Sequence, residues 1–188
     1  MNNRLALAIL LAPLAVACGK PYVVIRAANP NPFVRPGCKV VVEDVQMDKL
    51  VVGGKTDAEY FADKKPEAQA SYNEDKAAFA ALFRTELMNR RGDLVGPPPA
   101  SGDNTFVMRP HFVFWEPGYN IGISSRAAEA TVVIDVLDPT GQNILDEIRT
   151  TAKAGGFASG SKMRATGEIL AGYTARYLKD RFVCAPVD

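Results

Sequence analysis

Residues 130–153 read ATVVIDVLDPTGQNILDEIRTTAK and contain two runs of alternating side chains on either side of a turn. Valine or isoleucine occupies every second position from 132 to 136, which is the period of a strand with one buried face. Asp138-Pro139-Thr140-Gly141 follows, and its proline presets the φ angle of a β-turn. The run 143–153 alternates again, so the segment predicts an antiparallel β-hairpin.

Two further segments of the chain have the composition of strands. Cys38–Val45 contains a continuous valine run, which is typical of a strand covered on both faces. Thr105–Glu116 is rich in β-forming residues. Simple alternation along it places Phe112 and Phe114 on one face and Trp115 on the other.

Two long helices are expected to cover the sheet. Tyr72–Arg91 carries an apolar stripe at helical spacing, and Ser71 and Glu74 have the spacing of a capping box at its start. Lys162–Arg181 is the second helix. The sequence therefore predicts an α+β fold with a mostly antiparallel sheet of about four strands and two main helices packed on one face, in the order β-α-β-β-β-α.

Prolines, glycines and one cap refine this expectation. A capping box at 56–59 opens a short helix that must stop by Pro66. Pro110 lacks a backbone N–H, which predicts that its strand lies at a sheet edge or begins late. Gly167 and Gly172 each cost the last helix about 1 kcal/mol of propensity, so we expect them to face a closely approaching sheet.

The first residues of the chain have the pattern of a bacterial export signal. Arg4 is their only charge, and the apolar run Leu5–Leu14 is too short to cross a bilayer as a helix. Ala15-Val16-Ala17-Cys18 then resembles the lipobox of bacterial lipoproteins, in which the cysteine is acylated and becomes the first residue. The alternative is an ordinary cleavable signal followed by an incidental cysteine. The lipoprotein interpretation divides the chain into a signal peptide (1–17), a lipidated tether and lead-in (18–37) and a single α+β domain (38–188).

Charge and the residue after Cys18 indicate where such a protein would lie. The chain has 22 basic and 21 acidic residues, and removal of the segment with Arg4 leaves no net charge. Electrostatic attraction to nucleic acid is therefore not expected. By resemblance to lipoprotein sorting in Gram-negative bacteria, Gly19 in place of aspartate favours the outer membrane, with the protein facing the periplasm. Several acyl chains on one residue would hold it stably in the membrane.

Cys38 and Cys184 remain as an even pair once Cys18 carries lipid. Disulfides persist in the oxidising cell envelope, so we predict that the pair is bridged. On the loop-entropy model this bridge contributes ~4–5 kcal/mol, because it closes nearly the whole domain. Two separately buried thiols are the alternative, since spacing alone does not place the sulfurs within bonding range.

Groups that could carry catalysis are scarce. His111 is the single histidine, and no serine occupies a Gly-x-Ser-x-Gly elbow. A glycosidase could use a carboxylate pair, but acids spaced along strands are common on a solvated face. The acids concerned are Glu43, Asp44, Asp135 and Glu147. Zinc or iron would need clustered histidine and cysteine, so no catalytic residue, metal site or cofactor is assigned.

One segment is a candidate binding site. Trp115-Glu116-Pro117-Gly118-Tyr119 places two large aromatic residues in a turn at a strand end. Such a turn tends to be partly exposed, and aromatic residues are enriched where proteins bind each other. Trp115, Glu116 and Tyr119 are therefore predicted to bind a partner.

The same residues carry a resemblance to a family. The run 114–118, the strand from Ala127 to Leu137, the turn 138–141, the return strand to Lys153, Gly155-Gly156 and a closing helix resemble uncharacterised bacterial lipoproteins of the domain-of-unknown-function 4410 type. The resemblance covers about residues 38–182. It implies a fold similar to the small α/β domains of other envelope lipoproteins, and it carries over no catalytic residue.

These observations lead to one expected function and two alternatives. We expect a non-enzymatic lipoprotein that binds another envelope protein or serves as an accessory part of a larger assembly. A cell-wall hydrolase or glycan-modifying enzyme is the first alternative. A carrier of a small apolar ligand between sheet and helices is the second.

Overall fold

The computed structural model describes residues 19–97, 102–121, 124–156 and 158–184, so the predicted signal 1–17 and the predicted lipid site Cys18 lie outside the described residues. The strands are β1 (Tyr22–Arg26), β2 (Lys39–Val42), β3 (Val51–Val52), β4 (Lys55–Thr56), β5 (Val95–Gly96), β6 (Thr105–Glu116), β7 (Tyr119–Ile121), β8 (Ser124–Arg126), β9 (Ala128–Leu137) and β10 (Ile144–Ala154). The helices are α1 (Asp57–Ala62), α2 (Pro66–Arg91) and α3 (Ser159–Arg181). Within these ranges, no helix combines the length and the apolar composition that crossing a bilayer requires.

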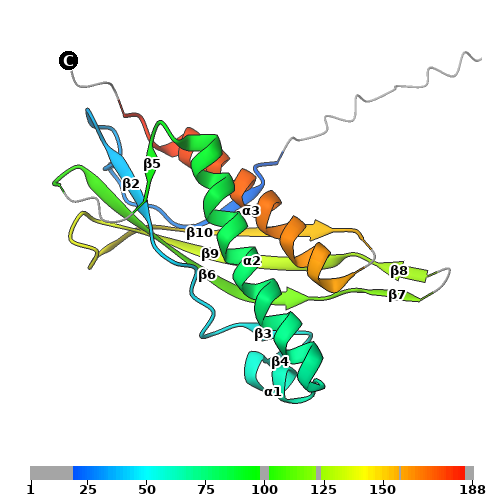
Figure 1. Cartoon of the computed structure of the whole chain (residues 1–188). Coiled ribbons are helices and arrows are strands. Elements are labelled where there is room, and N and C mark those ends of the chain that lie inside the picture. The colour runs from blue at the N-terminus through cyan, green and yellow to red at the C-terminus, as the bar shows by residue number, and fades with distance from the viewer. Residues whose placement is uncertain (1–18, 98–101, 122–123, 157, 185–188) are drawn as a thin grey trace, which may run out of the picture.

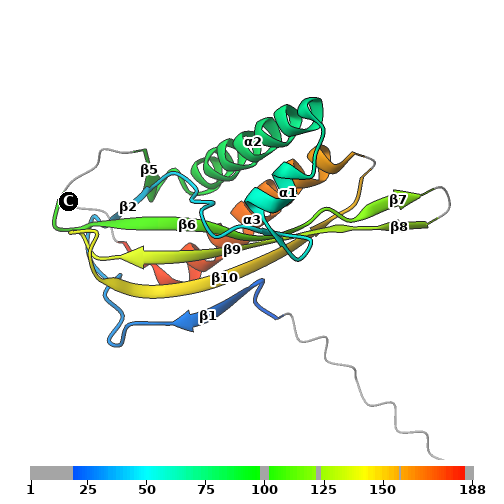
Figure 2. The ribbon, with the colours of Figure 1, turned by 90° about the horizontal axis from the view of Figure 1, so that it is seen from below.

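The molecule has two layers, a curved sheet and a pair of long helices. Figures 1 and 2 show α2 and α3 side by side on one face of β6, β9 and β10, and none of the described helices lies on the other face. Phe79 of α2 stacks on Phe112 of β6 with ring centroids 4.1 Å apart, so the space between the layers is filled by side chains. The α+β class and the one-sided helix layer are as predicted.

The predicted hairpin forms the centre of the sheet. β9 and β10 pair antiparallel from Ala128 opposite Ala154 to Leu137 opposite Ile144. The turn between them is closed by Asp138, whose carboxylate accepts hydrogen bonds from Asn143 and Thr140. Gly141 adopts φ +72°, a conformation that suits a residue without Cβ. Local sequence therefore determines this part of the fold.

The sheet is larger and more mixed than the predicted antiparallel one of about four strands. The described residues form an eight-stranded sheet whose main path runs β1-β10-β9-β6-β2-β5. β2 pairs parallel to both β6 and β5, and β3 also pairs parallel to β6. Helix α2 is the crossover that makes β2 and β5 parallel, since parallel neighbours need a long connection. β5 and β3 have two residues each, too few to show a period in the sequence.

Strand β6 lies inside the sheet, which corrects the prediction that Pro110 places it at an edge. β9 pairs along one side of β6, and β2 and β3 pair along the other. The N–H of Phe112 donates to the carbonyl of Gln46 at 2.8 Å. Backbone nitrogens two residues apart point to the same side of a strand. The nitrogen of Pro110 therefore points the same way as that of Phe112, toward residues 43–46, which follow the end of β2. The missing donor therefore costs no ladder hydrogen bond with β9.

Helix α2 begins earlier than predicted. Its first residue is Pro66, and Ser71 lies inside the helix instead of capping it. Proline is favourable at the first helical position, where its missing N–H would have no partner. The capping box of α1 forms as predicted, with reciprocal hydrogen bonds between Thr56 and Glu59. The last helix begins at Ser159, and its N-cap is Ala158 without a side-chain cap.

The two glycines of α3 face the other helix, not the sheet as predicted. A Cβ on Gly167 would lie 3.1 Å from both the ring and the carbonyl oxygen of Phe79. A Cβ on Gly172 would meet the guanidinium of Arg90 at 3.6 Å. Both neighbours belong to α2. Gly167 therefore lets the two helices approach closely, whereas Gly172 leaves room for an ordinary contact with Arg90.

A disulfide joins the two ends of the domain. Cys38 and Cys184 are bonded, with Cα atoms 5.2 Å apart, as the cysteine count predicted. Beside the bond, Phe33 stacks on Phe182 with centroids 4.2 Å apart. Residues 22–26 of the expected lead-in also belong to the sheet, where β1 pairs antiparallel with β10. The folded body therefore begins at Tyr22.

Candidate functional site

A β-bulge decides which aromatic side chains of β6 reach the surface. The register of β6 against β9 shifts between Phe112 and Phe114. A bulge adds one residue to one strand. Side chains beyond the bulge therefore point to the face opposite to the one that simple alternation predicts. Phe112 and Trp115 are consequently both buried, while Phe114 is partly exposed on the other face.

The predicted binding segment therefore does not form one exposed patch. Trp115 is fully buried, and its indole Nε1 has no hydrogen-bond partner among the described residues. Glu116 is half-buried opposite Glu129 of β9. Tyr119 is 46% exposed at the start of the β7–β8 ribbon, which Figure 1 shows extending beyond the helices. The expectation of a partly exposed aromatic holds for Tyr119 and is wrong for Trp115.

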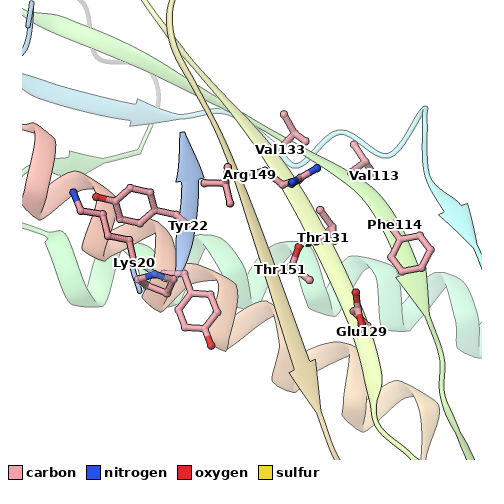
Figure 3. Close-up of a pocket in the computed structure, with 12 residues that line it drawn as sticks. Lys20, Tyr22, Val113, Phe114, Glu129, Thr131, Val133, Arg149 and Thr151 are labelled. Carbon is pink, nitrogen blue, oxygen red and sulfur yellow. Dashed lines mark hydrogen bonds between the residues drawn. The ribbon is translucent and has the colours of Figure 1, made fainter. Parts of the chain in front are cut away.

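A groove lies on the side of the sheet that the helices leave uncovered (Figure 3). Its volume is about 740 Å³. Residues of β6, β9 and β10 form its floor, and the chain before and within β1 forms one end together with Tyr173 of α3. The lining residues named in the figure are Lys20, Tyr22, Val113, Phe114, Glu129, Thr131, Val133, Arg149 and Thr151. We call this feature the sheet groove.

The sheet groove combines an apolar strip with hydroxyl and charged groups. Phe114 and Val133 supply apolar surface. The hydroxyls of Thr131 and Thr151 lie 3.0 Å apart across neighbouring strands. Arg149 adds a cation, and its register neighbours on both sides are valines, not acids. Such a surface suits contact with a polypeptide, because it offers both apolar area and hydrogen-bonding groups.

A charged cluster adjoins the sheet groove. The guanidinium of Arg109 donates to the carboxylate of Glu43 at 2.6 and 3.1 Å, and this hydrogen bonding holds the pKa of Arg109 above its usual value. His111 Nε2 lies 3.2 Å from Asp135 Oδ2. Glu147 is opposite Asp135 on the next strand. The structure thus brings together His111 and three of the acids considered from the sequence.

The chemistry of this cluster is limited by what surrounds the imidazole. A histidine oriented by a carboxylate can act as a general base toward a nearby hydroxyl or water. Among the described residues, no serine or threonine hydroxyl is hydrogen-bonded to His111. Asp44 pairs with Arg84 of α2, away from the histidine. The cluster therefore has a base and its orienting group, but among the described residues it has no serine or threonine hydroxyl bonded to that base.

Sequence reasoning missed a buried ionic cluster at the end of α3. Asp146 of β10 is fully buried and accepts hydrogen bonds from Tyr177 Oη at 2.8 Å, Arg181 Nε at 2.7 Å and the Ala28 N–H at 2.9 Å. Burial, with the Asp146 charge beside it, raises the pKa of the Tyr177 hydroxyl. The sequence did contain a signal for this cluster, because Asp146 is an acidic residue at a position where the alternation of the strand places apolar side chains. The cluster fastens the chain after β1 to α3, which is a structural role.

A metal site requires several ligands close together. Across the described ranges, no group of three or more histidine, cysteine, aspartate or glutamate side chains is placed to hold a metal ion.

Comparison with known proteins identifies no family for this chain. No family model matches it, and no curated protein matches it. Among solved structures it is similar to the PelC dodecamer from Paraburkholderia phytofirmans, at 13% identity over 81% of this chain and 96% of that chain, with a TM-score of 0.42. It is also similar to a Xanthomonas campestris protein of the DUF330 family model, at 12% identity over 83% of this chain and 89% of that one, with a TM-score of 0.38. Both similarities are distant and assign no function.

Proposed function

We propose that this chain is a lipoprotein of the bacterial outer membrane that faces the periplasm and binds another envelope protein without acting as an enzyme. The observation that carries the proposal is the bond between Cys38 and Cys184. Disulfides form and persist in oxidising compartments such as the periplasm and are rare in the cytosol. The disulfide therefore supports the export signal and lipobox at 1–18. We also propose, from the resemblance described above, that the chain is related to the lipoproteins of the domain-of-unknown-function 4410 type.

The position of β1 bears on how such an anchor would act. Strand β1 begins at Tyr22, four residues after Cys18. An extended chain spans at most ~3.3–3.6 Å per residue, so the tether reaches roughly 13–14 Å. A lipid on Cys18 would therefore hold the β1 side of the sheet close to the membrane surface.

A binding role is favoured over the two alternatives. The sheet groove lies on the face of the sheet that the helices leave uncovered, which gives a partner protein direct access (Figure 3). Buried side chains of the sheet and the helices, among them the stacked Phe79 and Phe112, pack where a carried apolar ligand would have to lie. The pair of His111 and Asp135 keeps the hydrolase as the second candidate function, because it supplies a base with an orienting carboxylate.

Intact mass of the protein purified from its native membrane tests the anchor and the disulfide together. We expect a lipid-sized gain at the mature N-terminus and a two-hydrogen shift on reduction. Cys18→Ser should abolish the lipid gain alone, and its matched control Cys184→Ser should abolish the reduction shift alone. An unlipidated wild-type chain would contradict the anchor.

Cross-linking in intact cells tests the binding role. We expect at least one envelope protein to cross-link more strongly to wild type than to Cys18→Ser at equal expression. Equal recovery with both would contradict the proposal. For the hydrolase alternative, purified protein is incubated with isolated peptidoglycan. Release of fragments by wild type and its loss in His111→Ala would replace the binding role with an enzymatic one.

A further inference from the structure

The edge strand β1 carries an exposed apolar surface. Val23, Val24 and Ile25 are consecutive, and these residues are 52%, 47% and 50% exposed. β1 is the last strand on the path of the sheet, so among the described residues no strand pairs with its outer edge (Figure 2). Valine and isoleucine are among the residue types most often buried in proteins. A contiguous run of them at the surface is typical of a site that contacts another phase or molecule.

Both faces of β1 contribute to this surface. Adjacent residues of a strand point to opposite faces. Val23 lines the sheet groove, whereas Val24 lines a cavity on the helix side together with Tyr177 of α3. A rigid partner on one face of the sheet would leave one of these two valines in water. Fluid lipid can surround the strand from its outer edge and reach both faces, which favours a bilayer surface as the occupant.

The fold holds β1 in place at both ends. Tyr22 is buried, and its hydroxyl donates a 2.7 Å hydrogen bond to the carboxylate of Asp180 in α3. Beyond the strand, the N–H of Ala28 donates to Asp146 at 2.9 Å. The three exposed apolar residues lie between these two attachments. Their exposure is therefore a property of the folded domain and not of a frayed chain end.

Basic side chains surround the start of β1. Lys20 lines the sheet groove together with Arg149, and it lines a second cavity together with Arg176 of α3. The side chains of Lys20 and Arg176 are 64% and 60% exposed, and Arg149 is exposed as well. Arg26 adds an exposed cation at the other end of the strand. Basic side chains near an anionic lipid surface strengthen binding to it.

The acidic groups near β1 are less exposed than these cations. Glu147 is half-buried opposite Arg26 in the register of β1 against β10. The Asp180 side chain is 22% exposed and already pairs with Lys20. Glu129, further along the sheet groove, pairs with Lys153. The exposed charge around β1 is therefore positive, although the chain as a whole has nearly equal numbers of basic and acidic residues.

We propose that β1 docks on an anionic phospholipid bilayer, with Val23, Val24 and Ile25 among the headgroups and the surrounding basic side chains against lipid phosphates. The strand stays at headgroup depth, because its unpaired backbone groups would lack hydrogen-bond partners in the hydrocarbon. The inference rests on the anchor proposed above, since Cys18 lies four residues before Tyr22. Residues 20–23 also form one end of the sheet groove, so docking would place that end next to the membrane.

Quenching of tryptophan emission by lipid tests the contact. The Val24→Trp variant of the full chain is purified from its native membrane and reconstituted in vesicles of phosphatidylcholine and phosphatidylglycerol. Half of the samples contain phosphatidylcholine that is brominated on its acyl chains near the headgroup. We expect the brominated lipid to quench the introduced tryptophan. The native Trp115 is fully buried and supplies a constant background.

Val51→Trp is the matched control. Val51 is also a partly exposed valine, at 37%, but β10, β9 and β6 separate its strand β3 from β1. Its tryptophan should not be quenched. Equal quenching of the two variants, or no quenching of Val24→Trp, would overturn the proposal. Emission from Val24→Trp that is blue-shifted but unquenched would show that protein, such as a second copy of the chain, covers β1 instead of lipid.

Two arginines of α3 test the contribution of charge. Arg176 and Arg164 each pair with an aspartate, and their side chains are 60% and 51% exposed, but Arg164 lies roughly three turns further from β1 along the helix. In the Val24→Trp background, Arg176→Gln should lower the ratio of docked to undocked protein about fivefold, and Arg164→Gln should leave it unchanged. Omission of phosphatidylglycerol should lower the ratio as well. Equal ratios in the two variants would contradict the assigned lipid charge.

These outcomes are separable from those of the proposed function. Intact mass reports whether the purified chain carries lipid, and quenching reports whether β1 touches the bilayer. A lipidated chain without quenching overturns only the docking of β1. Quenching in a chain that carries no lipid overturns only the anchor.

Discussion

The carboxylate of Asp146, fully buried in β10, accepts a 2.7 Å hydrogen bond from Nε of Arg181 at the last residue of α3. The same carboxylate accepts the N–H of Ala28, just after β1. The buried carboxylate of Asp146 therefore connects three parts of the molecule, which are the segment that follows the edge strand β1, the central hairpin and the last helix.

Replacing this carboxylate should be costly. Asp146→Ala leaves the Arg181 charge without its partner, and breaking a buried pair from one side costs about 3–5 kcal/mol. Urea unfolding of the variant measures this loss. Asp44→Ala is the matched control, because Asp44 pairs with Arg84 but its side chain is 91% exposed, and exposed pairs contribute about 0–1 kcal/mol. Equal losses in the two variants would contradict the structural role of Asp146.

Trp115 and Tyr119 should respond in opposite ways to truncation. Trp115→Ala removes a fully buried side chain and should cost about 3–5 kcal/mol of unfolding free energy. Tyr119→Ala removes an exposed one and should change stability by no more than about 0.5 kcal/mol. Thermal unfolding distinguishes the two. Tryptophan emission that is strongly quenched by acrylamide in the native wild type would show that Trp115 is exposed after all.

The two glycines of α3 provide a matched pair. Gly167→Ala gains about 1 kcal/mol of helix propensity but forces a Cβ to 3.1 Å from the Phe79 carbonyl, and overpacking costs about 1–3 kcal/mol. Gly172→Ala gains the same propensity with only ordinary contacts to Arg90. We expect Gly167→Ala to be the less stable of the two in denaturant unfolding. The reverse order would mean that α2 and α3 do not approach closely at Gly167.

The turn residue Asp138 should make stability depend on pH at the acidic end. Hydrogen bonds from Asn143 and Thr140 hold its pKa below the ordinary value of 3.8. The folded state therefore binds this proton less readily than the unfolded chain, and the stabilisation is present above the unfolded pKa and lost as the pH falls through the folded one. Asp138→Asn should flatten the stability profile below pH ~4. An NMR titration in which the Asp138 carboxyl protonates at its ordinary pKa would contradict the expected shift.

Local patterns were sufficient for several features of this molecule. The hairpin of β9 and β10 follows from residues that alternate on either side of a proline turn, and the capping box of α1 follows from Thr56 and Glu59. The disulfide follows from the cysteine count and the predicted compartment. Each depends on the chemistry of neighbouring residues or on the number of cysteines, and both can be taken from a single sequence.

Other features required information from distant residues. The bulge between Phe112 and Phe114 moved Trp115 from the predicted binding surface into the core, and it is visible only in the pairing with β9. The glycines of α3 face α2 because of how the helices pack, which their spacing does not reveal. The two-residue strands β3 and β5 exist through their parallel pairing, since neither is long enough to show a period.

By itself, the sequence determined the α+β class, the central hairpin and the pairing of Cys38 with Cys184, because these depend on periodicity, turn chemistry and cysteine count. Only the tertiary structure decided which face of the sheet the described helices cover and where the sheet groove lies. Those properties depend on how many neighbours each strand acquires from remote parts of the chain. Tyr22–Arg26 illustrates the division, because its β-forming residues are evident in the sequence, but its place beside β10 is defined only by the register of the two strands.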